Sequence, residues 1–419
     1  MNSTVRRLCS IACCAVVAMG ADWPQFRGPG GLGTSDEKGL PSRWGDRNEM
    51  VWNTDLPGFG ASSPIVLGDR VYLTCYSGYG QGGAETVGNM QSLKRHLVCV
   101  KRDDGQIAWN TDIETTLPDQ AYGGKYLPLH GYASSTPAGD GQRLFVFCGR
   151  SGVFAFDLEG KPLWRTSVGE GTHNWGSGTS PVLFKNLVIV NAGVESGSLV
   201  ALDKDDGHEV WRAGGMDRAW NTPLVVALPG AAELVVSVKN RVLAFDPQTG
   251  NELWSSPGIE DYVCPSAIAH GGVIYAIGGR GKPGLAVRAG GRGEVQPLWR
   301  TPKGSNVSSP VYHDGHLYWV GDSDGIAYCA DAETGRQVYG ERLTPSPDRI
   351  YASPTVADGK IYYVSRNNGT YVVAAKPKFE LLAHNLIDDD TSVFNASPAV
   401  SDGQLFLRSD QRLYCIGKP

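Results

Sequence analysis

Aromatic and cationic residues recur at two positions of this sequence, and both types can hold a ligand without reacting with it. An aromatic residue stands a few positions before most copies of a Ser-Pro or Thr-Pro pair. Rings gathered in one place would form a funnel for a peptide, a glycan or a planar ligand. Lys and Arg recur further along four copies, where they would form a collar that binds anions. The aromatic residues are Phe59, Tyr132, Trp175, Trp220, Tyr262, Tyr351 and Phe394, and the cations are Arg150, Lys239, Arg280 and Arg366.

Each set also has a plainer interpretation. The rings can pack between neighbouring repeats instead of facing a ligand. Asp322 and Asp410 take the cation position in two other copies, so the cations can simply pair with these carboxylates.

Residues for catalysis or metal binding are harder to single out. The segment Asp322–Gly325 reads DSDG and begins like a calcium loop, but it lacks the downstream ligands and predicts a turn. His130 and His173 have no evident carboxylate partner, and Asp388–Asp390 predicts a solvated loop. We therefore assign no catalytic residue and no metal ligand.

A repeated unit must position the two recurrent sets. Each copy predicts a short strand after the proline, a second strand, a third strand, a turn of the D-x-x-T-G type and a fourth strand that ends near Trp. Most copies are about 43 residues apart, the spacing of a four-stranded propeller blade. We predict an all-β, eight-bladed β-propeller of antiparallel blades over residues 50–419, with both sets near one mouth of its channel. The prolines are Pro64, Pro137, Pro181, Pro223, Pro265, Pro310, Pro354 and Pro398.

A large aromatic residue follows the turn glycine by four residues in five copies, for example in AFDPQTGNELW (Ala244–Trp254). A ring held at a fixed offset from a turn can lie flat across the neighbouring blade. We assign these residues to blade docking, not to a cofactor. The five residues with this spacing are Trp109, Trp164, Trp211, Trp254 and Tyr339, and we give Trp52 and Trp299 the same assignment.

The two ends of the propeller complement one another. The last copy has only three strands, and Glu49–Gly58 carries Trp52 in the pattern of a missing fourth strand. The N-terminal strand should therefore complete the last blade and leave no open edge in the ring. The first blade carries the excess length as insertions at about residues 76–96 and 114–130, which we expect to be surface loops.

Residues 1–20 predict an export signal, with Arg6 and Arg7 before an apolar run that is too short to span a bilayer. Residues 21–49 then form an N-terminal extension. The mature protein should be periplasmic or extracellular, and a lipid anchor at Cys13 is the alternative. A net charge of −5 argues against nucleic acid as a partner, and no later segment could span a membrane.

Six cysteines remain after the signal, and we expect them to be small core residues, with Cys264 in place of the Ser before Pro. The alternative in an oxidising compartment is a disulfide, first of all between Cys75 and Cys99.

Together with the repeat, the segments DWPQFRGPGGLGTS (Asp22–Ser35), LPSRW and SSPIVLGDRVYLT resemble the PQQ-like β-propeller repeat family. That family includes quinoprotein alcohol dehydrogenases and the propeller lipoprotein of the outer-membrane β-barrel assembly machinery. The dehydrogenase resemblance would imply PQQ, a calcium ion and an adjacent cysteine pair. Here the only adjacent pair, Cys13–Cys14, lies within the export signal.

We therefore expect an exported, monomeric, non-catalytic binding or scaffold propeller without a cofactor. Its partner would be an envelope protein, a glycan or a small ligand at the channel mouth. The alternative is an enzyme, either a divergent PQQ-dependent dehydrogenase or a carbohydrate-active propeller. Convergence of Glu195, Asp261 and Asp348 within about 10 Å would favour the enzyme.

Overall fold

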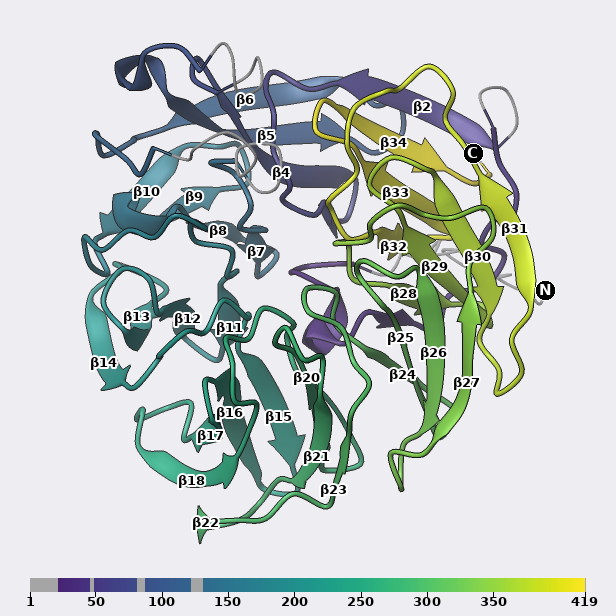
Figure 1. The fold of residues 1–419 in the computed structure, drawn as a ribbon. Coiled ribbons are helices and arrows are strands. Elements are labelled where there is room, and N and C mark those ends of the chain that lie inside the picture. The colour runs from purple at the N-terminus through teal and green to yellow at the C-terminus, as the bar shows by residue number, and fades with distance from the viewer. Residues whose placement is uncertain (1–21, 46–48, 81–86, 122–130, 419) are drawn as a thin grey trace, which may run out of the picture.

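The computed structural model describes residues 22–45, 49–80, 87–121 and 131–418. These residues form eight small, mainly antiparallel sheets around a central channel (Figure 1). The eight-bladed propeller predicted from the repeat is therefore confirmed. The predicted export signal, parts of both first-blade insertions and His130 lie outside the described residues.

Each blade has four main strands, and in the first seven blades they follow one another in chain order from the channel outward; in the eighth, the N-terminal strand takes the outermost place. The first blade comprises β3 (Ile65–Leu67), β4 (Arg70–Ser77), β5 (Lys94–Lys101) and β6 (Ile107–Ile113). The second comprises β7 (Ala138–Gly139), β8 (Arg143–Phe147), β9 (Val153–Asp157) and β10 (Pro162–Thr166). The third comprises β11 (Val182–Phe184), β12 (Leu187–Ala192), β13 (Ser198–Asp203) and β14 (Glu209–Gly214). The fourth comprises β15 (Leu224–Leu228), β16 (Ala231–Val238), β17 (Arg241–Phe245) and β18 (Glu252–Pro257).

The remaining four blades follow the same plan. The fifth comprises β19 (Ile268–His270), β20 (Val273–Ile277), β21 (Gly284–Arg288) and β23 (Trp299–Thr301). The sixth comprises β24 (Val311–His313), β25 (His316–Val320), β26 (Ile326–Asp331) and β27 (Gln337–Arg342). The seventh comprises β28 (Thr355–Ala357), β29 (Lys360–Val364), β30 (Thr370–Ala374) and β31 (Leu381–Asn385). The eighth comprises β32 (Ala399–Ser401), β33 (Gln404–Arg408), β34 (Arg412–Ile416) and β2 (Met50–Asp55).

The ring closes through the N-terminal strand, as the sequence predicts. Strand β2 pairs antiparallel with β34, with Trp52 opposite Cys415 and Asn53 opposite Tyr414. Two short strands add to blade edges in parallel: β1 (Thr34–Ser35) pairs with β28, and β22 (Gly293–Glu294) pairs with β18. The first and last parts of the propeller thus share one sheet. Unfolding of either part would leave the other part with an unpaired strand edge.

The hydrophobic core lies between the blades. Strands β4 and β5 are buried on both faces, whereas β6, on the outside of the same blade, has mostly exposed or half-buried residues. Between the first and second blades, Ile65 and Tyr72 pack with Leu144 and Phe154. The middle strands are therefore almost continuously apolar, because each of their faces meets another blade.

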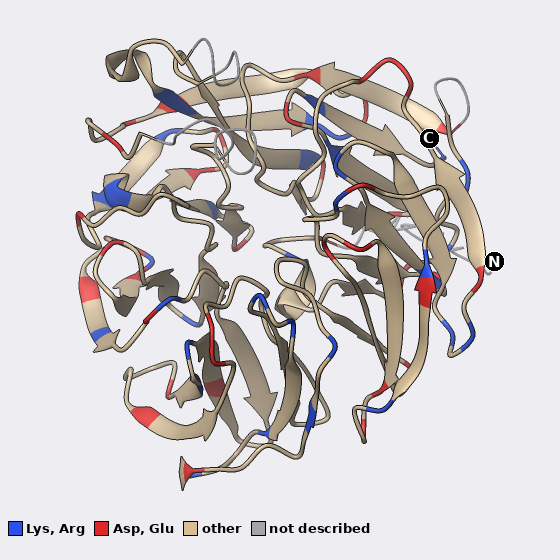
Figure 2. Ribbon diagram, viewed as in Figure 1, with Lys and Arg blue, Asp and Glu red and all other residues tan. Residues whose placement is uncertain are grey.

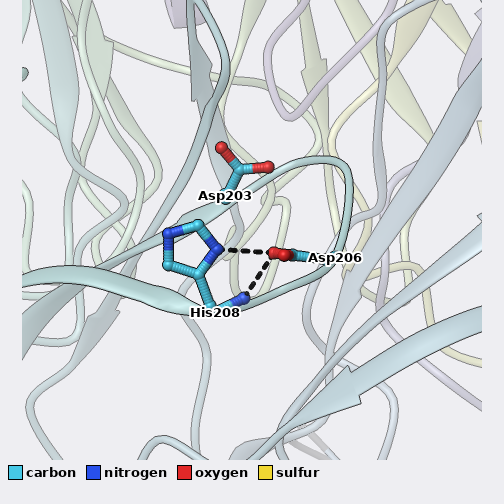
Figure 3. Close-up of side chains that lie close together, drawn as sticks. All are labelled: Asp203, Asp206 and His208. Carbon is cyan, nitrogen blue, oxygen red and sulfur yellow. Dashed lines mark hydrogen bonds and ion pairs between the residues drawn. The ribbon is translucent and has the colours of Figure 1, made fainter.

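The turn between β13 and β14 shows how the repeated DxxxG-type segment is built (Figure 3). One carboxylate oxygen of Asp203 accepts the backbone N–H of Asp205 at 2.8 Å, and the N–H of Gly207 donates to the Asp203 carbonyl at 3.0 Å. Gly207 has a φ of +75°, which glycine adopts without strain. The side chain of His208 lies 2.6 Å from the Asp206 carboxylate.

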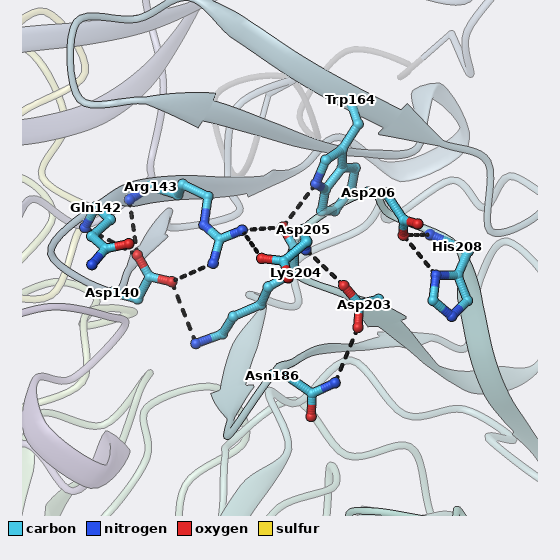
Figure 4. Close-up of polar contacts among 10 residues, drawn as sticks. All are labelled: Asp140, Gln142, Arg143, Trp164, Asn186, Asp203, Lys204, Asp205, Asp206 and His208. Carbon is cyan, nitrogen blue, oxygen red and sulfur yellow. Dashed lines mark hydrogen bonds and ion pairs between the residues drawn. The ribbon is translucent and has the colours of Figure 1, made fainter.

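This turn holds the tryptophan of the preceding blade (Figure 4). The indole N–H of Trp164 donates to the carbonyl of Lys204 at 2.9 Å, and Arg143 donates to the same carbonyl at 2.8 Å. A Cβ at Gly207 would lie only 2.5 Å from the indole ring, so glycine is needed for the close approach as well as for the turn. Trp52, Trp109, Trp211 and Trp299 make the same indole-to-carbonyl contact with their next blade, at 2.7–3.2 Å.

Two of the seven residues assigned to docking are held differently. The indole N–H of Trp254 donates to Glu233 of its own blade at 2.9 Å, because the fifth blade has no turn of this type to receive it. The ring of Tyr339 packs edge-on against Phe379, with ring centroids 5.7 Å apart.

The N-terminal extension crosses the channel beneath the ring, and its short turn at Pro29–Gly31 lies at the centre in Figure 1 (purple). Trp23 forms two backbone hydrogen bonds with Val66 of the first blade, both of 2.9 Å. Strand β1 reaches the seventh blade, and the backbone N–H of Val356 donates to Gly33 at 2.8 Å. The extension is therefore built into the propeller and closes one end of its channel.

Charges of both signs are interspersed around the ring in the view of Figure 2. No helix among the described residues is long and apolar enough to cross a membrane. The six described cysteines are all free, so the alternative of a Cys75–Cys99 disulfide is wrong. Cys75 packs toward the eighth blade and Cys99 toward the second, which places the two thiols on opposite faces of one blade.

Candidate functional site

The largest cavity described for the propeller lies on its axis and has a volume of about 360 Å³, within the ~300–1,000 Å³ typical of small-ligand sites. We call this cavity the axial well. Its mouth is lined by Trp175, Trp220, Tyr262 and Tyr351, and Phe26 of the N-terminal extension lines its closed end. Apart from these rings, the lining consists of small apolar, hydroxyl and amide side chains, and no described residue that lines the well is charged.

A ring of eight hydroxyl groups surrounds the axial well between its mouth and its floor. Each hydroxyl oxygen accepts the backbone N–H of its counterpart in the preceding blade, at 2.9–3.1 Å, and the eighth bond closes the circle from Ser397 to Ser63. These bonds lock neighbouring blades together at the channel. The hydroxyl ring consists of Ser63, Thr136, Ser180, Thr222, Ser266, Ser309, Ser353 and Ser397.

Seven of these residues are the Ser or Thr before the repeated proline. From the sequence, this Ser or Thr serves only to mark the repeat, and no hydrogen-bonding role is predicted for it. The fifth blade differs, because Ser266 follows Pro265 and supplies the hydroxyl. Cys264 does take the position before Pro265, but that position lies two residues ahead of the hydroxyl-ring residue in this blade. In all eight blades the hydroxyl residue stands two positions before the first strand, and in the fifth blade that position falls after the proline. Cys264 lines the well instead, and burial raises the pKa of its thiol to about 12.

Three of the seven recurrent aromatic residues form one cluster at the mouth. The ring centroids of Trp175 and Tyr262 are 4.6 Å apart with planes at 71°, and those of Trp175 and Trp220 are 5.1 Å apart. The indole N–H of Trp220 donates to Gly176 at 2.9 Å and fixes that ring to the neighbouring loop. Tyr351 also lines the well. The structure thus brings four of the predicted rings to the mouth.

The other three rings pack against protein side chains and do not line the axial well. Tyr132 is buried, and its hydroxyl donates to the backbone of Gln120 at 2.7 Å. Phe59 packs beside Tyr76, and Phe394 stacks on Tyr414. Each of these residues lies three or four positions before the hydroxyl-ring residue of its own blade. Distance along the chain therefore does not by itself separate them from the aromatic residues that line the well.

Two of the four predicted cations lie against the mouth rings. The guanidinium carbon of Arg280 is 5.3 Å from the centroid of Tyr262, and that of Arg366 is 5.2 Å from the centroid of Tyr351. These are distances at which a cation is attracted to an aromatic face. Arg366 also donates to the side chain of Asn395 at 2.9 Å. The two arginines therefore brace the mouth and do not enter the well.

The other two cations lie elsewhere, so the structure does not assemble a four-member collar. Arg150 donates to the carbonyl of Pro118 and lines a separate cavity. The backbone of Lys239 forms a bridge with Ile259. Of the proposed acidic partners, Asp322 pairs with Lys282 at 3.2 Å, and Asp410 is attracted to Arg408 and Arg366.

The separate cavity, which we call the side cavity, has a volume of about 30 Å³, room for about one water molecule. Glu195 lines it, and one of its oxygens accepts the hydroxyl of Ser177 while the other has no partner among the described residues. Burial raises the pKa of Glu195 to about 7. Because Ser177 is two residues from Trp175, this carboxyl supports the loop that carries a mouth ring.

The carboxylates that would indicate an enzyme do not meet in one cavity. Glu195 lines the side cavity. Asp261 accepts the backbone N–H groups of Tyr262 and Arg280, which lowers its pKa, and Asp348 accepts the side chain of Asn367 at 3.0 Å. Neither aspartate lines a described cavity.

Among the described residues, one group of three offers metal-ligand atoms within 4.8 Å of one another: Asp203, Asp206 and His208 (Figure 3). The turn already accounts for this group, because Asp203 accepts the N–H of Asp205 and Asp206 accepts that of His208. In the segment Asp322–Gly325, the carboxylate of Asp324 accepts the N–H of Ile326, as in an ordinary turn. His173 packs on Trp220, with centroids 4.9 Å apart.

A family model described as outer membrane protein assembly factor BamB matches residues 93–341 of the chain. The chain is 22% identical over 332 residues to tetrathionate hydrolase from Acidithiobacillus ferrooxidans, which covers 70% of this chain and 61% of that protein. It is also 22% identical to outer membrane protein assembly factor BamB from Burkholderia pseudomallei, over 72% of this chain and 71% of that protein. A europium-containing methanol dehydrogenase has the same fold, with a TM-score of 0.66 and 11% identity over 95% of this chain and 98% of that one.

Proposed function

The chain belongs to the PQQ-like propeller family described as outer membrane protein assembly factor BamB, and from this we propose that it is a non-catalytic binding protein whose ligand occupies the axial well. The observation that carries the proposal is the uncharged lining of the well beneath a mouth of four aromatic rings. Such a site can desolvate and hold a ligand but offers no acid, base or cation to react with it. We further propose that the protein works after export, in the periplasm or outside the cell, as a monomer that contacts an envelope protein or a glycan.

The alternative, a PQQ-dependent dehydrogenase, rests on the shared fold and on the family resemblance. PQQ carries three carboxylate groups, and a bound calcium ion needs several oxygen ligands, usually with carboxylates among them. No described lining residue supplies a cation or a carboxylate, and Cys264 is the one cysteine among them. The lining of the axial well therefore does not fit PQQ with calcium, and we derive no reaction step through that cofactor.

The proposal is tested by the melting temperature of the mature chain from Ala21 with PQQ plus calcium and, separately, with tetrathionate. We expect no shift with either, because both ligands are anionic and no described residue that lines the well carries a positive charge. A ligand held at a hundred times its dissociation constant adds about 2.7 kcal/mol to the free energy of unfolding, a shift that is easily seen. A shift with either ligand would replace the binding proposal with an enzymatic one.

A further inference from the structure

We propose that the ligand of the axial well is a neutral saccharide. Its sugar ring would lie among the hydroxyl groups of the lining, and its outward-facing side would lie against the aromatic residues at the mouth. This inference rests on the binding function proposed above and specifies the class of ligand. Its argument comes from three properties of the lining: its hydrogen-bonding groups, its charge and the arrangement of its rings.

The hydroxyl ring presents unused hydrogen-bonding capacity around the whole circumference of the well. Each oxygen accepts one backbone N–H, yet no hydrogen bond donated by any of these eight hydroxyls is found within the described part of the chain. The side-chain oxygen of Asn306 is also buried without a donor among the described residues. An apolar ligand would leave these groups unpaired, which is costly in a desolvated site. A ring bearing hydroxyl groups on all sides can both donate to and accept from them.

The charge of the lining separates a saccharide from a peptide. Phe26 of the extension that crosses the channel lines the well, so we expect a chain ligand to enter from the mouth by its end. A free peptide end carries an ammonium or a carboxylate group, and no described lining residue carries a charge to pair with it. The end of a neutral saccharide brings no charge into the well.

The rings at the mouth favour a saccharide over a flat heteroaromatic ligand. Trp175 and Tyr262 meet at 71°, and Trp220 and Tyr262 meet at 87°, so these pairs form no parallel slot for a planar molecule. Single aromatic faces at differing angles suit a puckered ring, whose C–H groups can pack on one face while its hydroxyls reach the wall.

Intrinsic tryptophan fluorescence tests the assignment, since two indoles lie at the mouth. The probes are maltose, cellobiose, mannobiose and N,N′-diacetylchitobiose, together with methyl β-glucoside and its charged counterpart methyl β-glucuronide. We expect at least one neutral saccharide to bind, and the glucuronide to bind more weakly than the glucoside. Binding of no neutral saccharide, or preference for the glucuronide, overturns the proposal.

Two glycines of the third blade provide a matched pair of variants. A side chain added at Gly178 would project into open space at the well, and one added at Gly214 would meet nothing within 4 Å at the outer strand. Gly178→Leu should weaken saccharide binding by about tenfold or more, whereas Gly214→Leu should leave it unchanged. Trp175→Ala gives a second readout, with an expected loss of about tenfold. Saccharide binding that survives Gly178→Leu and Trp175→Ala would place it outside the well and overturn the inference.

A further binding experiment distinguishes failure of this inference from failure of the proposed function. If an N-acetylated tripeptide amide binds in a Gly178-dependent way and the saccharides do not, the saccharide assignment is wrong while binding in the well stands. If neither class binds and PQQ with calcium raises the melting temperature, both proposals are wrong.

Discussion

Tryptophan serves two purposes in this molecule, and the difference lies in the regularity of its spacing. At the outer side of the blades, Trp164 lies at a fixed offset from a turn and docks on Gly207 of the next blade. At the mouth, Trp175 and Trp220 stand five and two residues before their hydroxyl-ring residues, yet they meet in one cluster. A constant offset reflects a packing requirement that most blades share. Where the offset varies and the aromatic residues still meet in space, they meet a requirement of one place in the propeller.

Removing one tryptophan of each kind tests this difference most directly. Trp211 is 8% exposed and donates to the carbonyl of Pro247. Trp211→Ala should therefore lower the free energy of unfolding by about 3 kcal/mol. Trp175→Ala should cost less than about 1 kcal/mol, because that ring is partly exposed at the well. Urea titrations of the two variants measure the difference. Equal losses would show that the mouth rings are also structural.

Two glycines, one beneath a docking tryptophan and one in the lining of the axial well, offer the next largest contrast. Gly207→Ala forces a residue with a side chain to φ +75° and places its Cβ 2.5 Å from Trp164, at an expected cost of about 2–3 kcal/mol. Gly178→Ala adds a methyl group to open space and should change stability by less than about 0.5 kcal/mol. Thermal unfolding monitored by circular dichroism compares them. A neutral Gly207→Ala would contradict the docking geometry.

A third prediction concerns the carboxyl beneath the mouth. The pKa of Glu195 is raised to about 7 by burial, so the folded protein binds its proton more tightly than the unfolded chain does. Its stabilising contribution is present below pH ~4.3, the usual glutamate value, and is lost as the pH rises through about 7. Glu195→Gln should match the wild type at pH 4.5 and exceed its stability by about 3 kcal/mol at pH 8.

Melting temperatures of both proteins between pH 4.5 and 8 measure this effect. Glu341→Gln is the control, because Glu341 is exposed on the sixth blade. A pH-independent difference between wild type and Glu195→Gln would show that the carboxyl is ionised throughout.

The smallest effect is expected in the hydroxyl ring. Ser353→Ala removes the acceptor of the Ser309 N–H and should cost about 1 kcal/mol, because water in the well can replace part of the lost bond. Chemical denaturation measures it, with the exposed Ser346→Ala as the control. A loss as large as that of Trp211→Ala would mean that the channel side of the blades contributes as much stability as the outer side.

The repeat made most of the fold predictable. The spacing of the prolines and the turn glycines gave the number of blades, and the unpaired segment around Trp52 gave the closure of the ring. The prolines recur in eight copies and the turn glycines in five, so each copy supports the interpretation of the others. The fifth blade shows the limit of such a pattern. There the proline does not mark the position of the hydroxyl, which Ser266 supplies one residue after it.

The sequence by itself determined what depends on local spacing: the blades, their order, the docking tryptophans and the circle that β2 completes. Only the tertiary structure decided which aromatic residues face a cavity, because Tyr132 and Tyr262 precede the hydroxyl ring by the same four residues and end in a buried core and at the mouth of the well. It also decided that Phe26, far from every repeat, lines the axial well. Such contacts join residues distant along the chain, and their formation depends on how eight blades and one crossing segment fill the space around a common axis.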